Sequence, residues 1–200
     1  AEQGCFEWLP KVIDGGAGHA LHLKDQSWWR IQGLRLTSDS RTGKCGLMAE
    51  VTRAERRPRG LSVFGVVAVG NGAAGINIGG SRVEGMGYDG VVVENCLSFW
   101  NSKDGIVLHG SRRDGSRNMV IRRCTVFGNR GMAGMWIHST TNGLIERCVA
   151  YNNTVVNIWT WNANNVTMRK CESFRCGHLR GAADADGYDI DWGSQACTIE

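Results

Sequence analysis

Proline is scarce in this sequence: only 2 of the 200 residues are proline, although 28 are glycine. This combination favours many tight turns between short strands, because glycine adopts turn conformations that most residues avoid. Helical periodicity of useful length is missing too, which argues against leucine-rich or ankyrin-like repeats. No apolar run reaches the roughly 18 residues that a membrane-spanning helix needs, so we expect no membrane insertion.

Strong charge of one sign is also lacking, since the formal net charge is +4. The basic residues do not alternate with aromatic residues as they do in known nucleic-acid-binding modules, so we expect no nucleic-acid partner. Residues 1–10 contain neither the basic nor the apolar stretch of a signal peptide. A signal could still have been removed or lie upstream.

An internal repeat is what the sequence does contain. An Asn or Asp, usually followed by a Gly, precedes an apolar–x–apolar triplet, and the triplets recur every 21 to 32 residues. The copies are Asn71 with Ile76–Ile78, Asn101 with Ile106–Leu108, Asn129 with Met135–Ile137, Asn152 with Val156–Ile158, and Asp186 with Tyr188–Ile190. We expect each Asn to adopt the left-handed turn conformation and the stacked copies to form an Asn ladder.

A second ladder ends in cysteine and runs out of phase with the first. It includes Cys96, Cys124, Cys148, Cys171 and Cys197, at spacings of 28, 24, 23 and 26 residues. Stacked rungs about 4.8 Å apart could bring neighbouring cysteines close enough for disulfides, but inward-pointing free thiols are the simpler expectation. The absence of a C-x-x-C pair gives little support for a zinc site.

Two short strands in a repeat of about 24 residues cannot bury an apolar face by themselves. Each repeat must pack against the next copy, as the repeats of a solenoid do. The sequence therefore predicts an all-β fold, a right-handed single-stranded parallel β-helix of about 6–8 coils. We expect a single domain over residues 1–200, with longer loop insertions near 37–62 and 110–118. Both ends look uncapped, which suggests a fragment of a longer solenoid.

Stacking of the coils predicts two outward columns on one sheet, because side chains alternate along a strand. The expected first column is Asn77, Val107, Trp136, Asn157 and Asp189. The expected second column is Gly79, His109, His138, Trp159 and Asp191.

His109 and His138 should lie on adjacent rungs, within roughly 5 Å. With Asp191 two rungs further, they suit general acid–base catalysis near neutral pH, and a charged neighbour would lower the pKa of each imidazole. The alternative is ordinary polar residues on a solvated sheet.

Asp189 and Asp191 are expected to face outward from one strand, with Cα atoms about 6.6–6.8 Å apart. Inverting glycosidases use carboxyl groups about 6.5–9.5 Å apart, so the pair could be catalytic. A Ca²⁺ site is an alternative, with Asp184 and Asp186 supplying further oxygens. A plain acidic surface is the third possibility.

Trp136, Trp159 and Trp161 could present flat apolar plates for sugar rings, unless loops bury them. Asn157 would lie on the same face. Trp192 is expected to point inward. His178 and Arg180 precede the acidic strand and could contact a uronate carboxylate, since Arg binds carboxylates in a bidentate manner.

From about Gly18 onward, the chain resembles the right-handed β-helix carbohydrate-active superfamily, which includes pectate lyases, other polysaccharide lyases, some glycoside hydrolases and epimerases. The segment Trp29–Leu34 resembles an early coil of these proteins. Residues 184–191 resemble the acidic strand that binds Ca²⁺ near the substrate in some pectate lyases. The resemblance implies a secreted, periplasmic or cell-surface protein. The triplet strands carry no outward Lys, and the polygalacturonase signatures are absent.

Three functions remain open from the sequence. The first is cleavage of a polysaccharide, either as a lyase on a uronate-containing glycan, with Ca²⁺ and Arg180 neutralising the uronate, or as a glycoside hydrolase using Asp189 and Asp191. The second is glycan binding without turnover. The third is a structural solenoid.

Overall fold

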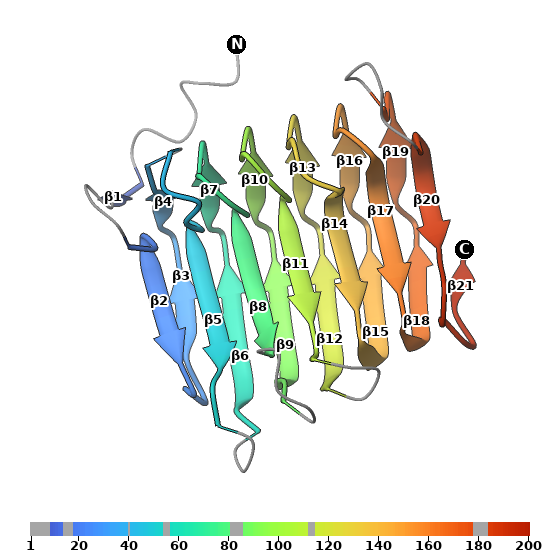
Figure 1. Ribbon diagram of the computed structural model, residues 1–200, viewed down its shortest axis with the longest axis horizontal. Helices are drawn as coiled ribbons and strands as arrows, with labels where there is room; N and C mark the ends of the chain where they lie inside the picture. The colour runs from blue at the N-terminus through green and yellow to red at the C-terminus, as the bar shows by residue number, and fades with distance from the viewer. Residues whose placement is uncertain are drawn as a thin grey trace.

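The computed structural model describes residues 9–13, 18–39, 41–53, 57–80, 86–111, 115–177 and 184–200. Every regular element in these ranges is a β-strand, and the strands form three parallel sheets of seven. Each coil of the chain adds one strand to each sheet, and the coils follow one another along the long axis (Figure 1). The predicted all-β parallel β-helix is therefore confirmed. No helix that could cross a membrane occurs among the described residues.

We name the sheets A, B and C. Sheet A contains β1 (Lys11–Ile13), β4 (Arg35–Thr37), β7 (Val67–Val69), β10 (Leu97–Phe99), β13 (Thr125–Phe127), β16 (Val149–Tyr151) and β19 (Glu172–Phe174). Sheet B contains β2 (Leu21–Lys24), β5 (Leu47–Val51), β8 (Ile76–Gly80), β11 (Ile106–His109), β14 (Ala133–His138), β17 (Val156–Trp161) and β20 (Asp186–Ile190). Sheet C contains β3 (Arg30–Gln32), β6 (Arg59–Phe64), β9 (Asp89–Glu94), β12 (Ser116–Arg122), β15 (Thr140–Glu146), β18 (Asn164–Arg169) and β21 (Thr198–Ile199).

The coil has three strands, whereas the sequence predicted two. The strands of sheet A were missed because they are three residues long and turn only their middle residue inward, which leaves no apolar–x–apolar pattern. In β10 that residue is Ser98, which is fully buried and whose Oγ donates a hydrogen bond to the carbonyl of Gly105 at 2.8 Å.

The predicted interior column on sheet B is confirmed. Ile76, Ile106 and Met135 are paired in register and fully buried. Ile158 continues the column and Tyr188 follows it. Burying one such aliphatic side chain contributes about 1.5–3 kcal/mol, so the stacked columns account for the core of the solenoid.

The predicted Asn ladder is also confirmed. The amide Nδ2 of Asn71, Asn101 and Asn129 each donates to the Oδ1 one coil further on, at 2.8, 2.8 and 2.9 Å. The last acceptor is Asn153, one residue beyond the Asn152 expected from the sequence. The left-handed backbone belongs to the residue before each ladder Asn, as at Asn152 with φ 54°.

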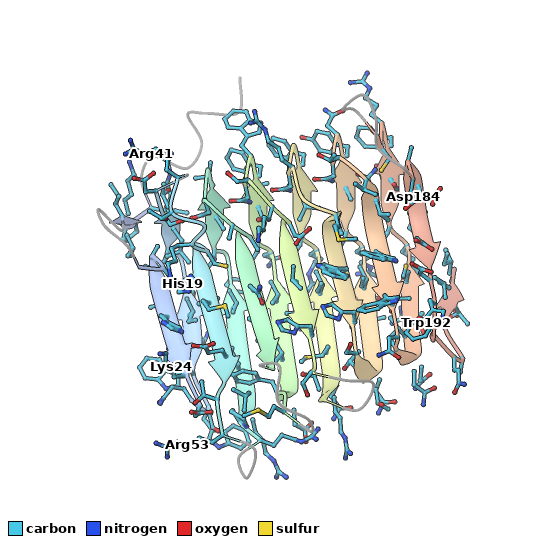
Figure 2. All side chains as sticks on the ribbon, in the orientation of Figure 1. His19, Lys24, Arg41, Arg53, Asp184 and Trp192 are labelled. Carbon is cyan, nitrogen blue, oxygen red and sulfur yellow. The ribbon has the colours of Figure 1, made fainter. Side chains whose placement is uncertain are left out.

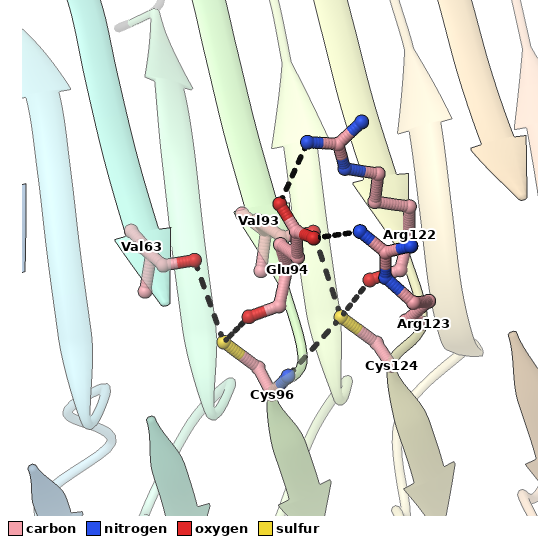
Figure 3. Close-up of polar contacts among 7 residues, drawn as sticks. All are labelled: Val63, Val93, Glu94, Cys96, Arg122, Arg123 and Cys124. Carbon is pink, nitrogen blue, oxygen red and sulfur yellow. Dashed lines mark hydrogen bonds and ion pairs between the residues drawn. The ribbon is translucent and has the colours of Figure 1, made fainter. Parts of the chain in front are cut away.

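The cysteine ladder faces the interior, and all seven described cysteines are unbridged. The backbone N–H of Cys96 donates to Sγ of Cys124 at 3.5 Å (Figure 3), and Cys148 contacts Cys171 in the same way at 3.4 Å. Cys197 does not continue this ladder. Because Thr198 pairs with Thr167, Cys197 is aligned with the residue before Thr167 and belongs to another interior column.

The expected insertion at 37–62 is not one long loop, because it contains β5 and the start of β6. The stretch 110–118 contains the connection to β12, which begins at Ser116. Longer connections also join β8 to β9 and β19 to β20.

Candidate functional site

The outward side of sheet B forms one continuous face, which we call the B wall. Its first column contains His22, Met48, Asn77, Val107, Trp136, Trp159 and Asp189 in register. Its second column contains Lys24, Glu50, Gly79, His109, His138 and Trp161, and Asp191 follows at the end of β20. With rungs about 4.8 Å apart, the B wall extends roughly 29 Å along the axis. Lys24 lies at its blue end and Trp192 at its red end (Figure 2).

Strand β17 differs from the expected alignment by two residues. Ile158 pairs with Met135, so the outward residues are Trp159 in the first column and Trp161 in the second. The sequence placed Trp159 in the second column. The misalignment arose because Thr160 points inward, fully buried, where its Oγ1 donates to a backbone carbonyl of the previous coil at 2.8 Å.

Asn157 is fully buried, which contradicts the substrate contact expected for it. It occupies the position that Gly134 occupies in the previous coil. Its Oδ1 accepts from Asn153 at 2.9 Å, and its Nδ2 donates to Oγ of Ser173 at 2.9 Å. The side chain therefore extends the interior Asn ladder.

His109 and His138 stack on adjacent rungs as predicted, with ring centroids 5.1 Å apart and an angle of 8° between the rings. Nε2 of His109 lies 3.0 Å from Oδ1 of Asn77 and Nδ1 lies 3.3 Å from the carbonyl oxygen of Gly110, and a neutral ring donates its single N–H to one of these two acceptors. The His109 ring lies over Gly79, where an added Cβ would overlap it. Gly79 therefore provides the space in which His109 reaches Asn77.

Burial lowers the pKa of both imidazoles. For His138, burial and then the neighbouring His109 lower the pKa to about 3. The largest cause is desolvation, not the charged neighbour that the sequence suggested. Both rings are neutral at pH 7. Because a base with so low a pKa accepts a proton poorly at neutral pH, stacking and hydrogen bonding suit His138 better than proton abstraction.

The aromatic rings of the B wall form a continuous surface. Trp136 and Trp159 stack at 4.6 Å with an angle of 5°, and Trp136 lies 4.1 Å from His138. Trp161 lies 5.7 Å from His138. Trp159 is 7% exposed and stacks beside Trp136 on the next rung, whereas Trp136 and Trp161 are half-buried.

The indole N–H groups of Trp136 and Trp159 are buried, and neither has a hydrogen-bond partner in the described part of the chain. A buried donor without a partner costs about 1–3 kcal/mol. The aromatic surface is therefore not optimised for stability alone.

Trp192 extends the aromatic surface, which corrects the expectation that it points inward. It is 72% exposed, and its ring centroid lies 6.2 Å from that of Trp161.

The acidic strand β20 ends the B wall. Asp189 pairs in register with Trp159. Burial, followed by the negative charges of Asp191, Asp186 and Asp184, raises the pKa of Asp189 to about 6. A carboxyl group with that pKa carries its proton in a large fraction of molecules just below neutral pH, as a general acid requires.

The four aspartates expected to bind Ca²⁺ do not converge. Among the described residues, which include Asp184, Asp186, Asp189 and Asp191, no three His, Cys, Asp or Glu side chains are grouped closely enough to hold a metal ion. Calcium typically takes six to eight oxygen ligands. As placed here, the four carboxylates do not form such a set of ligands, and Ca²⁺ stays a prediction from these residues and from the resemblance.

Sequence reasoning missed the other end of the B wall. Nε2 of His22 lies 2.8 Å from Oε1 of Glu50, and Nζ of Lys24 lies 3.8 Å from the same oxygen. Lys24 is an outward lysine, which the sequence had not identified. Gly46 followed by Leu47–Val51 matches the later repeats, but it was passed over because Ser38 replaces the ladder Asn and bonds to Asn71.

His178 and Arg180, the expected contacts for a uronate, lie outside the described residues.

Comparison with known proteins begins with a structural likeness. The enzymatically active domain of tailspike protein 2 from bacteriophage CBA120 has a TM-score of 0.51 and 11% sequence identity to this chain. The match covers 95% of this chain but 39% of the tailspike domain, so the chain spans well under half the length of that protein. The likeness supports the fold.

A plasmid-mediated fluoroquinolone resistance protein, QnrB1, also has 11% identity over 86% of this chain and 91% of its own length, but its TM-score of 0.20 does not indicate a shared fold. No curated protein sequence matches the chain.

The family described as the right handed beta helix region matches residues 19–200. That range includes β2 to β21 and therefore all of the B wall. The chain belongs to the right-handed β-helix family.

Proposed function

We propose that this protein hydrolyses a polysaccharide that lies along the B wall, with Asp189 as general acid and Asp191 as its partner carboxylate. The observation that carries this proposal is the raised pKa of Asp189, about 6, at the end of an aromatic surface. Pairs of carboxyl groups with different environments are typical of glycosidases.

Asp189 would donate its proton to the oxygen of the scissile glycosidic bond, and Asp191 would activate a water molecule on the opposite side of the sugar. The two residues are two apart in an extended segment, with Cα atoms about 6.6–6.8 Å apart. The side chains extend beyond these Cα atoms and can place their carboxyl groups at the separation of about 6.5–9.5 Å that inverting enzymes use, so we propose inversion at the anomeric carbon.

The aromatic surface would hold the sugar rings. Trp161 is half-buried, Trp192 is exposed and extends the surface beside the acids, and Trp136, stacked on Trp159 and His138, adds its exposed part. The neutral imidazoles of His109 and His138 would add ring contacts and hydrogen bonds, which is a different role from the acid–base one expected from the sequence. The shared fold with a tailspike domain described as enzymatically active is compatible with catalysis.

A lyase acting on a uronate is the second candidate, and Lys24 favours it as an outward cation on the B wall. Lys24 lies six rungs from β20, however, and is paired with Glu50. The described residues around Asp189 add negative charge and no cation that would neutralise a uronate. For these reasons we favour hydrolysis. A non-catalytic glycan binder is the third candidate.

The test is incubation with neutral polymers, such as galactomannan, xyloglucan and dextran, and with polygalacturonate and alginate. We expect new reducing ends without an unsaturated, ultraviolet-absorbing product. The variant Asp189→Asn should slow cleavage by roughly 10²–10⁴-fold. The matched control is Glu172→Gln, which neutralises an exposed carboxylate on sheet A.

An unsaturated product would establish a lyase instead. Binding of a polymer without cleavage under any condition would support the binder. Equal rates for Asp189→Asn and Glu172→Gln would exclude Asp189 as the acid.

A further inference from the structure

The outward face of sheet C contains a hollow of about 370 Å³, within the range of about 300–1,000 Å³ typical of ligand pockets. It lies over β12, β15 and β18, on a different sheet from the B wall. We call it the C groove; its principal lining residues are Asn118, Val120, Asn142, Leu144, Asn165 and Thr167.

The floor of the C groove is largely apolar. Val120, Leu144 and Thr167 are paired in register on adjacent rungs, and all three are half-buried. The floor therefore runs parallel to the solenoid axis and crosses three coils.

One side of the C groove is a row of three exposed amides. Nδ2 of Asn165 donates to Oδ1 of Asn142 at 2.8 Å, and Nδ2 of Asn142 donates to Oδ1 of Asn118 at 3.3 Å. Asn118 in turn donates to Asp89 at 2.7 Å. An amide has two N–H donors and two acceptor lone pairs, so each of these bonds uses one donor and leaves hydrogen-bonding capacity for a ligand.

Backbone geometry alone does not require asparagine at these positions. Asn118, Asn142 and Asn165 have φ of 55°, 61° and 56°. The matching positions of two earlier coils are Gly60 and Gly90, with φ of 66° and 78°. Glycine adopts this left-handed conformation without strain, so asparagine adds an amide to a turn that glycine already satisfies.

Charge on the far side of the C groove is balanced or slightly negative. Arg169 pairs with Glu146 at 2.9 Å, and Glu200 adds a further carboxylate to the lining. An anionic polymer would therefore meet no unpaired cation among the described lining residues.

We propose that the C groove binds a segment of an uncharged glycan. Sugar hydroxyls both donate and accept hydrogen bonds, which suits the amide row, and the C–H face of a sugar suits the apolar floor. An extended peptide fits less well, because the backbone groups of β12, β15 and β18 are paired between coils and offer no free strand edge. This inference does not depend on hydrolysis at the B wall.

The test is native gel electrophoresis through gels that contain galactomannan, xyloglucan, dextran or, as the anionic comparison, polygalacturonate. All proteins carry Trp161→Ala, so that binding at the B wall is weakened. The groove variant is Asn142→Gly with Asn165→Gly, which keeps the left-handed backbone that Gly60 and Gly90 show to be compatible. The matched control is Asn95→Gly with Asn152→Gly, the same change at two left-handed turns outside the C groove.

We expect at least one neutral polymer to retard the protein that carries Trp161→Ala alone, which is the parent in this experiment. The groove variant should bind it about tenfold more weakly, and the control should bind within about twofold of the parent. Thr167→Arg, which obstructs the floor without touching the amide row, should reproduce the loss if the double glycine variant folds poorly.

Equal retardation of parent, groove variant and Thr167→Arg would overturn the proposal. So would retardation by polygalacturonate alone. A change of sedimentation coefficient in the groove variants without a change in glycan binding would assign the C groove to contact with a second copy of the chain instead.

Discussion

Sheet C and the β20 end of sheet B have the same ladder geometry but different charge patterns: sheet C pairs opposite charges, as Lys24 and Glu50 also do at the far end of sheet B, whereas β20 gathers like charges. On sheet C, Glu94 pairs with Arg122 at 2.7 Å and also with Arg123 (Figure 3), and Glu146 pairs with Arg169 at 2.9 Å. On the B wall, Asp189 has carboxylates as neighbours, and its pKa rises.

Rungs about 4.8 Å apart make each side chain the neighbour of its equivalent in the next coil. Opposite charges across a pair of strands stabilise it, and like charges destabilise it. Hydrogen bonds from Arg123, then from Arg122, hold the pKa of Glu94 below its usual range. The comparison indicates that sheet C uses charge to hold register, whereas the B wall keeps perturbed groups of the kind found at functional sites.

The largest expected effect comes from removing the carboxyl group of Asp189, whose pKa is raised. Asp189→Asn should abolish most cleavage and yet raise the melting temperature at pH 7. The pKa of Asp189 is higher in the folded protein than in the unfolded chain, so stability is lost as pH rises from about 4 to about 6; this penalty is fully present at pH 7, and the asparagine variant avoids it. Thermal unfolding at several pH values measures it.

The gain in melting temperature should shrink as pH falls from about 6 to about 4 and vanish below that. A variant that is less stable than the parent at pH 7 would contradict the assignment of Asp189 as a strained, functional group.

A smaller effect is expected at the imidazole pair. The folded-state pKa of His138, about 3, lies below its unfolded value, so stability is lost as pH falls from about 6.5 towards 3. His138→Phe keeps a ring against Trp136 but removes the titration. At pH 4 it should be more stable than the parent by on the order of a few kcal/mol, relative to their difference at pH 7.

Urea unfolding at pH 7 and pH 4 provides the measurement. If parent and variant lose the same free energy of unfolding between these pH values, the buried, neutral state of His138 is incorrect.

Removal of one aromatic ring should weaken glycan binding at the B wall moderately. Trp161→Ala should weaken glycan binding there by about 1–2 kcal/mol, or about five- to thirtyfold, because one stacking face is lost. The matched control is Trp29→Ala, which removes a tryptophan that is 49% exposed and lies outside the B wall. Isothermal titration with a cleavage-resistant oligosaccharide or with the Asp189→Asn background measures the change. Equal affinities for the two alanine variants would remove Trp161 from the binding surface.

The smallest effect is expected on sheet C. Glu146→Gln should cost less than about 1 kcal/mol of unfolding free energy, because its partner Arg169 is 41% exposed and solvent screens an ion pair at the surface. A double-mutant cycle with Arg169→Gln isolates the coupling between the two charges. Any loss of cleavage in these variants would mean that sheet C does more than hold register.

The repeat could be predicted from the sequence wherever the inward residues are apolar. Ile76, Ile106 and Met135 revealed their shared column because each belongs to an apolar–x–apolar triplet after a glycine. The pattern failed where a polar residue points inward, as at Ser98 and Thr160, whose buried hydroxyls are satisfied by backbone carbonyls.

The candidate site was partly predictable for the same reason. His109 and His138 were placed correctly because the strands that carry them are clear copies of one another. Asn157 was misplaced because β17 is shifted by two residues, which puts Asn157 at the position of Gly134, beside the turn, where its side chain bonds to the interior Asn ladder. Lys24 and Glu50 were missed because the first coils carry Ser38 in place of the ladder asparagine.

The sequence by itself determined the solenoid, the interior columns and the stacking of equivalent residues, because these follow from a repeat whose every copy needs its neighbour to bury its apolar face. Only the tertiary structure decided which groups are perturbed. The pKa values of His138 and Asp189 depend first on burial, and that of His138 also on His109 in the previous coil; the C groove exists only where three coils lie side by side. Local patterns carry no information about desolvation, because it is set by everything packed around a group.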